Sequence, residues 1–391
     1  ETETETETET ETETETETET DSMKWLADLQ RGHHGAPQNK NALEGATGRL
    51  AMDHLALDLG GTQSRLCRRA SDGSILEERT VYTNRLDSVL ARQPTSRVVV
   101  EACAEAFAVA DQALSHGHEV RVVPSTLVKA LGVGQRGIKT DKRDAQNLSR
   151  ASCAMPLPTI HIPSTSSRER KAMVAARESL VASRTALINS VRGWMRTRLL
   201  KLPTGATSSF PTRVRVAISA TKEGLPVFIE RILFMIDELN AQISQATDEL
   251  EDIAKQDPCC QRLMSTPGVG AITAISFAAA IDDPTRFANA HAAESYLGLT
   301  PGEDSSGQRK RRTGITKAGD KRTRYLLVQA AWSLRRTQPH DPAARWARAV
   351  EERRGKKVAI IALARKLAGI LFALWRDGTT YNPLRTADTT T

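Results

Sequence analysis

Apolar residues along this chain change their spacing from one segment to the next, and each spacing predicts a different architecture. Residues 52–164 alternate short β-rich runs, HLALD at 54–58, RVVV at 97–100 and EVRVVP at 119–124, with helical stretches at 101–117 and 141–152. Alternation of this kind is typical of an α/β domain with a largely buried sheet.

Residues 165–256 follow a seven-residue repeat instead. One seam consists of Met173, Leu180, Leu187 and Trp194, with Val174, Val181, Ile188 and Met195 beside it. A second seam consists of Ile232, Ile236, Leu239, Ile243, Ala246, Leu250 and Ile253. Such seams are typical of helices that pack as a coiled coil, and the stretch from Pro203 to Pro211 is expected to turn the chain between them. An intramolecular helical hairpin and a dimerisation arm both fit this pattern.

The two ends of the chain differ from these segments. Residues 1–51 begin with ten Glu-Thr repeats, which have no apolar side chain to bury. We expect this segment to be a disordered extension, or an artefact of the assigned translation start, with the folded protein beginning near Met52. Residues 257–383 are expected to form a mostly α-helical domain that closes with a helix at 358–376, and residues 384–391 a tail.

The charge balance points to a polyanionic partner. The whole chain has a formal net charge of +7, but residues 52–391 alone carry 50 basic and 34 acidic residues, a net charge of +16. An excess of this size indicates nucleic acid rather than a small-molecule substrate. The five cysteines lack the spacing of a zinc site, and we recognise no signal peptide or membrane-spanning apolar run. We therefore expect a protein of the reducing cytoplasm, with no disulfide bonds and no membrane partner.

Four carboxylates stand where secondary-structure elements are expected to begin or end. Asp58 ends the first strand, Glu101 directly follows the strand RVVV, and Asp141 and Asp144 open the helix at 141–152. The i, i+3 spacing of the last two places both on one helical face. Mg²⁺ prefers oxygen ligands, and two such ions can activate a nucleophile and stabilise the leaving oxygen of a phosphodiester. Each acid alone is more often a turn or helix-capping residue, but the set of four predicts a divalent-metal site.

The first of these acids also belongs to a different motif. Asp58 begins the sequence Asp-Leu-Gly-Gly-Thr, which resembles the first phosphate-binding loop of sugar kinases with an actin-like fold. A kinase of that type needs a second nucleotide-binding subdomain with its own Gly-rich loop. The heptads and basic helices after residue 164 offer no such loop, so the sequence favours the metal site over the kinase.

Two features of the C-terminal segment suit a nucleic-acid backbone. The turn MSTPGVGAITA at 264–274 resembles a helix-hairpin-helix in which backbone amides near Gly268 and Gly270 hold a phosphate, although a tight turn between two packed helices fits equally well. A Gly-broken stretch further on is dense in cations, as expected of a phosphate-binding surface, although a solvated charged face has the same composition. Its cations are Arg309, Lys310, Arg311, Arg312, Lys317, Lys321, Arg322 and Arg324.

Two serines, Ser305 and Ser306, directly precede this basic run. A serine hydroxyl flanked by cations can attack a phosphodiester, because positive charge stabilises the negative charge that develops. Serines in a Gly-rich loop are usually turn residues, so composition alone does not nominate either one.

Taken together, these motifs resemble the DEDD transposases of the insertion-sequence family numbered one hundred and ten. The resemblance runs from Met52 to about Pro383 and rests on LALDLG, VVVEAC, GIKTDKRDA, STPGVGAITA, and LGLTPGEDSSG with GITKAGDKRTRYLL, in that order. It implies an RNase H-like (RuvC-like) α/β domain at 52–164, a coiled-coil helical insertion at 165–256 and a mostly α-helical C-terminal transposase domain at 257–383.

The same resemblance implies roles for the site residues. Asp58, Glu101, Asp141 and Asp144 match the family's DEDD acids, which would hold Mg²⁺, and the family's catalytic serine falls on Ser305 or, as the alternative, Ser306. That serine would form a covalent link to DNA. Members of the family are understood to assemble as oligomers, in which acids of one subunit and the serine of another build a composite site. Some members are guided by an RNA encoded in the element, so the expected partners are DNA, further copies of the chain as a dimer or tetramer, and a guide RNA.

Two alternatives stay open at this point. A Holliday-junction-type endonuclease would use the four acids to hydrolyse DNA, with no serine nucleophile. An inactive DNA-binding derivative would keep the basic surface and catalyse nothing. A covalent protein–DNA species distinguishes the recombinase from both.

Overall fold

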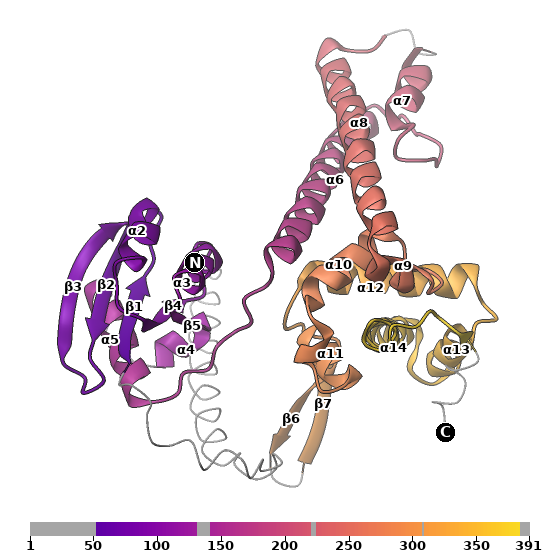
Figure 1. Cartoon of the computed structure of the whole chain (residues 1–391). Helices are drawn as coiled ribbons and strands as arrows, with labels where there is room; N and C mark the ends of the chain where they lie inside the picture. The colour runs from indigo at the N-terminus through magenta and orange to yellow at the C-terminus, as the bar shows by residue number, and fades with distance from the viewer. Residues whose placement is uncertain (1–51, 131–140, 220–223, 307–308, 384–391) are drawn as a thin grey trace, which may run out of the picture. The chain divides into compact units, whose positions relative to one another are not determined.

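The structure is a computed structural model that describes residues 52–130, 141–219, 224–306 and 309–383 (Figure 1). The chain divides into two compact units, and the boundary between them along the sequence falls between Ile162 and Pro163. The extension expected at residues 1–51 and the tail expected at 384–391 lie outside the described residues.

The first unit is built on a five-stranded mixed sheet in the order β3-β2-β1-β4-β5. Strand β1 pairs antiparallel with β2 and parallel with β4, β2 pairs antiparallel with β3, and β4 pairs parallel with β5. This mixed arrangement is consistent with the expected RNase H-like domain. The strands are β1 (Asp53–Asp58), β2 (Gln63–Arg69), β3 (Ile75–Tyr82), β4 (Ser96–Glu101) and β5 (Glu119–Val123).

Helices cover both faces of this sheet, because the central strands are apolar on both sides. Leu55 and Val98 lie in a buried cluster with residues of α3, whereas Ala56 and Val99 lie in a second cluster with Leu148 of α5. Successive residues of a strand point to opposite faces, so the two clusters mark the two faces. The helical elements are η2 (Thr83–Arg85), α2 (Leu86–Leu90), α3 (Ala106–Ser115), α4 (Ser125–Ala130) and α5 (Asp141–Ala154).

Two details of this unit differ from the sequence-based expectation. The helix predicted at 101–117 begins only at Ala106, because Glu101 is the last residue of β4 and a short loop follows it. Strands β2 and β3 were not predicted. Both carry many charged residues, as in QSRLCRR and ILEERTVY, and β3 lies at the edge of the sheet, where polar side chains meet solvent.

The second unit begins with two long helices that pack against each other, α6 (Thr165–Thr197) and α8 (Val227–Gln256), joined through α7 (Phe210–Ser219). The Nε atom of Arg177 donates to Oγ1 of Thr247 over 2.7 Å, and Nη1 of Arg184 donates to Oδ1 of Asn240 over 2.9 Å. These helices therefore form an intramolecular helical hairpin, and a role in dimerisation stays a prediction.

On α6 the buried seam positions of the helical hairpin differ from the predicted ones, whereas on α8 they agree with the prediction. The buried seam positions are Ile236, Ile243 and Leu250 on α8 and Val174, Ile188 and Met195 on α6. Met173 and Trp194, which we predicted on the seam itself, are half-buried. The buried positions on α6 keep the seven-residue spacing and each lies one residue after a predicted position, so the period was right and the face is displaced by one residue.

The rest of the second unit is mostly helical, as expected, with one exception. A two-stranded antiparallel hairpin of β6 (Pro301–Ser306) and β7 (Arg309–Ile315) interrupts the helices. The helical elements are α9 (Pro258–Met264), α10 (Ala271–Ile281), η4 (Pro284–Arg286), α11 (Ala290–Tyr296), α12 (Lys321–Thr337), α13 (Pro342–Arg354) and α14 (Lys356–Asp377).

Helix α14 corrects one expectation. Among the described residues it is the helix that is long and apolar enough to cross a membrane, although we recognised no such run in the sequence. Its side chains at Leu363, Leu367, Leu371 and Phe372 are fully buried in the main apolar cluster of this unit. The helix packs against α9, α11, α12 and α13, so its apolar character is accounted for by a central place in the core.

Candidate active site

Asp58 and Glu101 end two neighbouring parallel strands. The β1–β4 ladder ends at Leu57 and Val100, and each acid comes one position after this pair. On their other sides, Asp58 still pairs with Arg65 of β2, and Glu101 with Val123 of β5. Adjacent strands lie about 4.8 Å apart, which makes the two acids close neighbours in the sheet. Residues two apart on a strand share a face. Asp58 and Glu101 therefore lie on the face of Ala56 and the α5 helix.

The third described acid comes from the helix that covers this face. Asp144 lies in the first turn of α5, and only 6% of its surface is exposed. Asp144, Leu148 and Ala151 follow the i, i+4, i+7 spacing of one helical face, and the two apolar residues pack on the sheet. Asp141 is the first residue of α5, but its side chain lies outside the described residues.

Polar side chains fix the orientation of α5 on the sheet. The Nδ1 atom of His54 lies 2.7 Å from Oγ of Ser152, and Nε of Arg69 donates to Oγ of Ser149 over 2.9 Å. All four of these side chains are buried. Burial first, and then the charge of nearby Arg97, lower the pKa of His54, which favours the neutral imidazole in this contact. The sequence analysis missed these residues, and the only signal was two serines three apart on the helix.

The four predicted acids suit Mg²⁺ by the chemistry of their oxygen atoms. Asp58, Glu101 and Asp144 also share one face of the sheet. Within the described residues, however, no three His, Cys, Asp or Glu side chains lie close enough together to hold a metal ion. The side chain of Asp141 lies outside the described residues, so a metal site formed by all four acids stays a prediction.

The glycine of the predicted phosphate-binding loop has a structural explanation. A Cβ atom built on Gly60 would lie 2.4 Å from the carbonyl oxygen of Gln63, so only glycine fits the tight turn between β1 and β2. The carbonyl oxygen of Gly60 also accepts a hydrogen bond of 2.6 Å from Oγ1 of Thr83. The motif that suggested a kinase therefore serves the turn.

The two serines lie at the end of β6, opposite the first cations of β7. In the register of this hairpin Ser305 pairs with Lys310, and Ser306 pairs with Arg309. Two further cations of this strand, Arg311 and Arg312, pair with Asp304 and Glu303. The side chains of residues 303–312 lie outside the described residues, and the serines and the acids belong to different units.

The remaining predicted cations divide into two groups. Lys317 and Lys321 are exposed. Arg322 forms an ion pair through its Nε atom with Glu178 of α6. Arg324 donates from Nη1 to the carbonyl oxygen of Ala318 over 2.7 Å, so part of its hydrogen-bonding capacity serves the fold.

The predicted helix-hairpin-helix turn joins α9 to α10. Gly268 has a φ of +85°, and a Cβ atom on it would lie 2.6 Å from the carbonyl oxygen of Ala330 in α12. Close packing therefore accounts for this glycine without a DNA phosphate. Gly270 is the N-cap residue of α10 and is exposed, and a Cβ atom on it would meet no other atom within 4 Å, so packing does not require a glycine here.

Two family models match this chain. A model described as transposase, for the DEDD transposases of IS110, matches residues 55–198. A model described as transposase of the IS116/IS110/IS902 family matches residues 260–346. The first match contains all four predicted acids, and the second contains both predicted serines.

Several curated proteins are similar to most of this chain. The transposase for insertion sequence element IS1111A of Coxiella burnetii is 30% identical over 338 residues, which cover 84% of this chain and 90% of that protein. The transposase for insertion sequence element IS1328 of Yersinia enterocolitica is 26% identical over 337 residues, which cover 84% of this chain and 98% of that protein. A Streptomyces coelicolor protein of insertion element IS110 is 28% identical over 159 residues, 40% of this chain and 38% of its own length. This chain belongs to the IS110 family and is a transposase with an N-terminal DEDD domain and a C-terminal domain of the IS116/IS110/IS902 type.

Proposed function

We propose that this transposase cuts and rejoins DNA strands with a serine nucleophile, assisted by Mg²⁺ on Asp58, Glu101, Asp141 and Asp144. The observation that carries the proposal is the meeting of three elements on one face of the first sheet. The carboxyl ends of β1 and β4 and the first turn of α5 each contribute an acid there. Acids placed on one face of a sheet suit phosphoryl transfer, in which the protein mainly positions the groups and balances charge.

The serine carries the covalent step. The Oγ atom of Ser305, or of Ser306 as the alternative, attacks a DNA phosphorus atom, and the bond from that phosphorus to one deoxyribose oxygen breaks. The serine proton is lost, and the departing oxygen leaves as a hydroxyl. A hydroxyl of another strand then attacks the serine-linked phosphate, which restores the serine and joins the strands. In the register of the hairpin Lys310 pairs with Ser305 and Arg309 with Ser306, and cations of this kind would stabilise the negative charge that develops. When bound, Mg²⁺ would supply further positive charge at the phosphate.

DNA is the substrate, and the basic stretch before and within α12 is its contact surface. Exposed Lys317 and Lys321 suit phosphate contacts, together with the cations of β7. The acids and the serine belong to different units, which suits a homo-oligomer that combines the acids of one subunit with the serine of another. An RNA guide from the element would leave target choice to base pairing.

A denaturing gel tests the chemistry. The full chain is incubated with the element's own DNA ends, its flanking non-coding RNA and Mg²⁺, and a DNA–protein adduct is sought. The variants are Ser305→Ala, Ser306→Ala and Asp144→Asn. Asp72→Asn serves as the control, since Asp72 is an exposed acid in the turn between β2 and β3.

We expect an adduct that disappears in one serine variant and in Asp144→Asn, but not in Asp72→Asn. Metal-dependent cleavage with no adduct, unchanged in both serine variants, would favour the Holliday-junction-type endonuclease. DNA binding with neither cleavage nor adduct would favour an inactive derivative.

Mixed variants test the composite site. Ser305→Ala and Asp144→Asn chains, each inactive alone, should form the adduct when mixed if acids and serine come from different subunits. A mixture that stays inactive, while each variant still forms oligomers with the wild type, would contradict that arrangement.

A further inference from the structure

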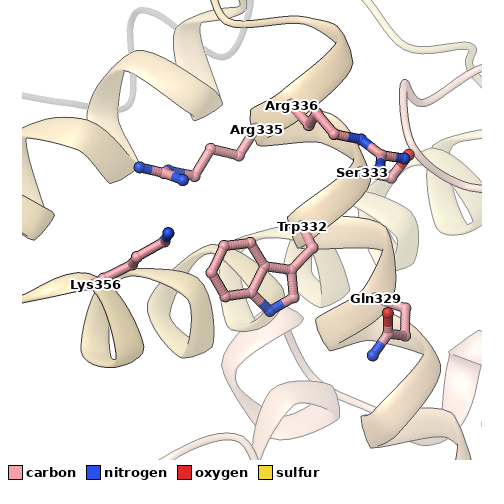
Figure 2. Close-up of a pocket in the computed structure, with 6 residues that line it drawn as sticks. All are labelled: Gln329, Trp332, Ser333, Arg335, Arg336 and Lys356. Carbon is pink, nitrogen blue, oxygen red and sulfur yellow. The ribbon is translucent and has the colours of Figure 1, made fainter. Parts of the chain in front are cut away.

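A cavity with an aromatic wall and a cationic rim lies between α12 and the start of α14, and none of the roles assigned above uses it. Its volume is about 520 Å³. Figure 2 shows the indole of Trp332 at its centre, with cationic side chains above and beside the ring. The lining residues are Gln329, Trp332, Ser333, Arg335, Arg336 and Lys356.

Two of the cations contact the aromatic ring. The Nζ atom of Lys356 lies 5.1 Å from the centroid of the Trp332 ring, and Cζ of Arg335 lies 5.8 Å from it. Both distances are within the range of cation–π attraction. The ring is half-buried, so part of its surface packs on the core while the rest faces the cavity.

The charge in the cavity is only partly balanced. Arg335 donates from Nη2 to Glu351 of α13 over 2.6 Å. In the part of the chain that the structure describes, neither Arg336 nor Lys356 has a carboxylate partner, and both are exposed. The cavity therefore offers one aromatic surface and two uncompensated cations.

A second tryptophan–lysine pair lies in the same unit and outside this cavity. Lys366 lies 4.9 Å from the Trp346 ring centroid. Lys366 is half-buried, and this burial lowers its pKa. Trp346 lies on α13 and does not line the Trp332 cavity, and it thus provides a matched control.

We propose that this cavity holds one unpaired nucleotide of a bound nucleic acid, with its base against Trp332 and its phosphate on Arg336 and Lys356. A base needs an aromatic surface and a phosphate needs cations, and single-stranded nucleic acids are bound by this combination. A base inside a duplex cannot reach a ring in a cavity, so the nucleotide is unpaired or extruded. The inference deepens the proposed function and rests on it only in requiring that the protein binds nucleic acid.

Photocrosslinking and affinity measurements on the full chain test this site. The probes are a short single-stranded RNA with 5-iodouridine, the corresponding DNA with 5-iododeoxyuridine, and a DNA duplex of the same sequence. The variants are Trp332→Leu, Trp332→Phe, Trp346→Leu and Arg336→Gln. Thermal melting of each variant checks that the fold is kept.

We expect the crosslink to map to Trp332 with a single strand and not with the duplex. Trp332→Leu should weaken single-strand binding roughly tenfold, as is typical of a lost base–aromatic stack. Trp332→Phe should retain most of the affinity, and Trp346→Leu should bind like the wild type. Arg336→Gln should reduce the slope of log affinity against log salt by about 0.7, the value for one phosphate of a single strand. The tighter of the RNA and DNA strands identifies the source of the nucleotide.

Equal losses in Trp332→Leu and Trp346→Leu would overturn the inference, because both would then reflect packing. Unchanged binding in Trp332→Leu, or the same loss with duplex as with single strands, would also overturn it. These binding results do not depend on whether the covalent DNA–protein adduct forms. An adduct that forms in the wild type while Trp332→Leu binds single strands normally would refute this site and leave the serine chemistry intact.

Discussion

Gly268 and Ala330 are packed backbone against backbone: a Cβ atom on the glycine would lie 2.6 Å from the carbonyl oxygen of the alanine. The turn between α9 and α10 thus rests directly on α12. The glycine also has a φ of +85°, a conformation that residues with side chains rarely adopt.

Gly268→Ala should lower the free energy of unfolding by about 2–4 kcal/mol, because the new methyl group must displace backbone and the residue must hold a strained φ. Gly270→Ala is the matched control, since Gly270 has an ordinary φ of −93° and open space around it. Its effect on stability should be below about 1 kcal/mol. Urea denaturation of both variants measures the difference, and equal effects would contradict the packing explanation.

The buried His54 should make stability depend on pH. Its pKa is lowered in the folded protein, mainly by burial, from the ordinary value of 6.5. Below pH 6.5 the unfolded chain therefore binds a proton that the folded protein resists. The free energy of unfolding should fall as the pH drops from 6.5 toward the folded pKa, and His54 should contribute no pH dependence above 6.5.

Comparison with His54→Asn isolates this effect from other titrating groups. Urea denaturation across this range should show that the stability advantage of the wild type shrinks as the pH falls. An advantage that grows on acidification would show that the imidazole is protonated in the fold, and the predicted direction would be wrong.

Lys317 has a left-handed backbone, with a φ of 57°, in the loop between β7 and α12. Residues with a Cβ atom pay about 1 kcal/mol for this conformation. Lys317→Gly should therefore raise the free energy of unfolding by up to about 1 kcal/mol. The same change should weaken DNA binding if the lysine contacts a phosphate, with a salt slope reduced by about 0.9 for a duplex. Lys321→Gln, an exposed cation at the start of α12, should reduce the salt slope without raising stability.

Substitutions at two neighbouring residues of α8 can distinguish the role of the hairpin's core from that of its exposed surface. Leu233 is fully buried, whereas 58% of the surface of Phe234 is exposed. Leu233→Ala should cost about 2–5 kcal/mol of stability, because it leaves a cavity among α6, α7 and α8. Phe234→Asp should leave the stability nearly unchanged. If this end of the hairpin also joins subunits, Phe234→Asp should shift the oligomer toward smaller species in sedimentation, and an unchanged distribution would exclude Phe234 from the interface.

The sequence predicted the segments with a strong apolar period better than those without one. Strands β1, β4 and β5 were recognised because each contains a short apolar run, whereas β2 and β3 carry charged side chains that mask the strand pattern. The hairpin of β6 and β7 was missed for the same reason, since RKRRTGI has the composition of a charged loop.

For the candidate site, the sequence predicted where the acids lie but not the buried polar contacts that hold α5 on the sheet. The positions of Asp58 and Glu101 at the ends of β1 and β4 could be predicted from the apolar runs before them, whereas their role as metal ligands stays a prediction. The contact between His54 and Ser152 joins residues 98 positions apart, so no local pattern could indicate it. The cavity beside Trp332 likewise depends on Lys356 of another helix, which the spacing within α12 does not reveal.

The central position of α14 has a consequence during synthesis of the protein. The helices that surround it, α9 and α11 to α13, all leave the ribosome earlier, and their shared core lacks its central member until α14 follows. The half of the molecule that carries Ser305 and Ser306 therefore cannot complete its folding while the message is still being translated through α14. A ribosome that stalls before Lys356 would release a chain with an open apolar core, which is a substrate for chaperones and proteases.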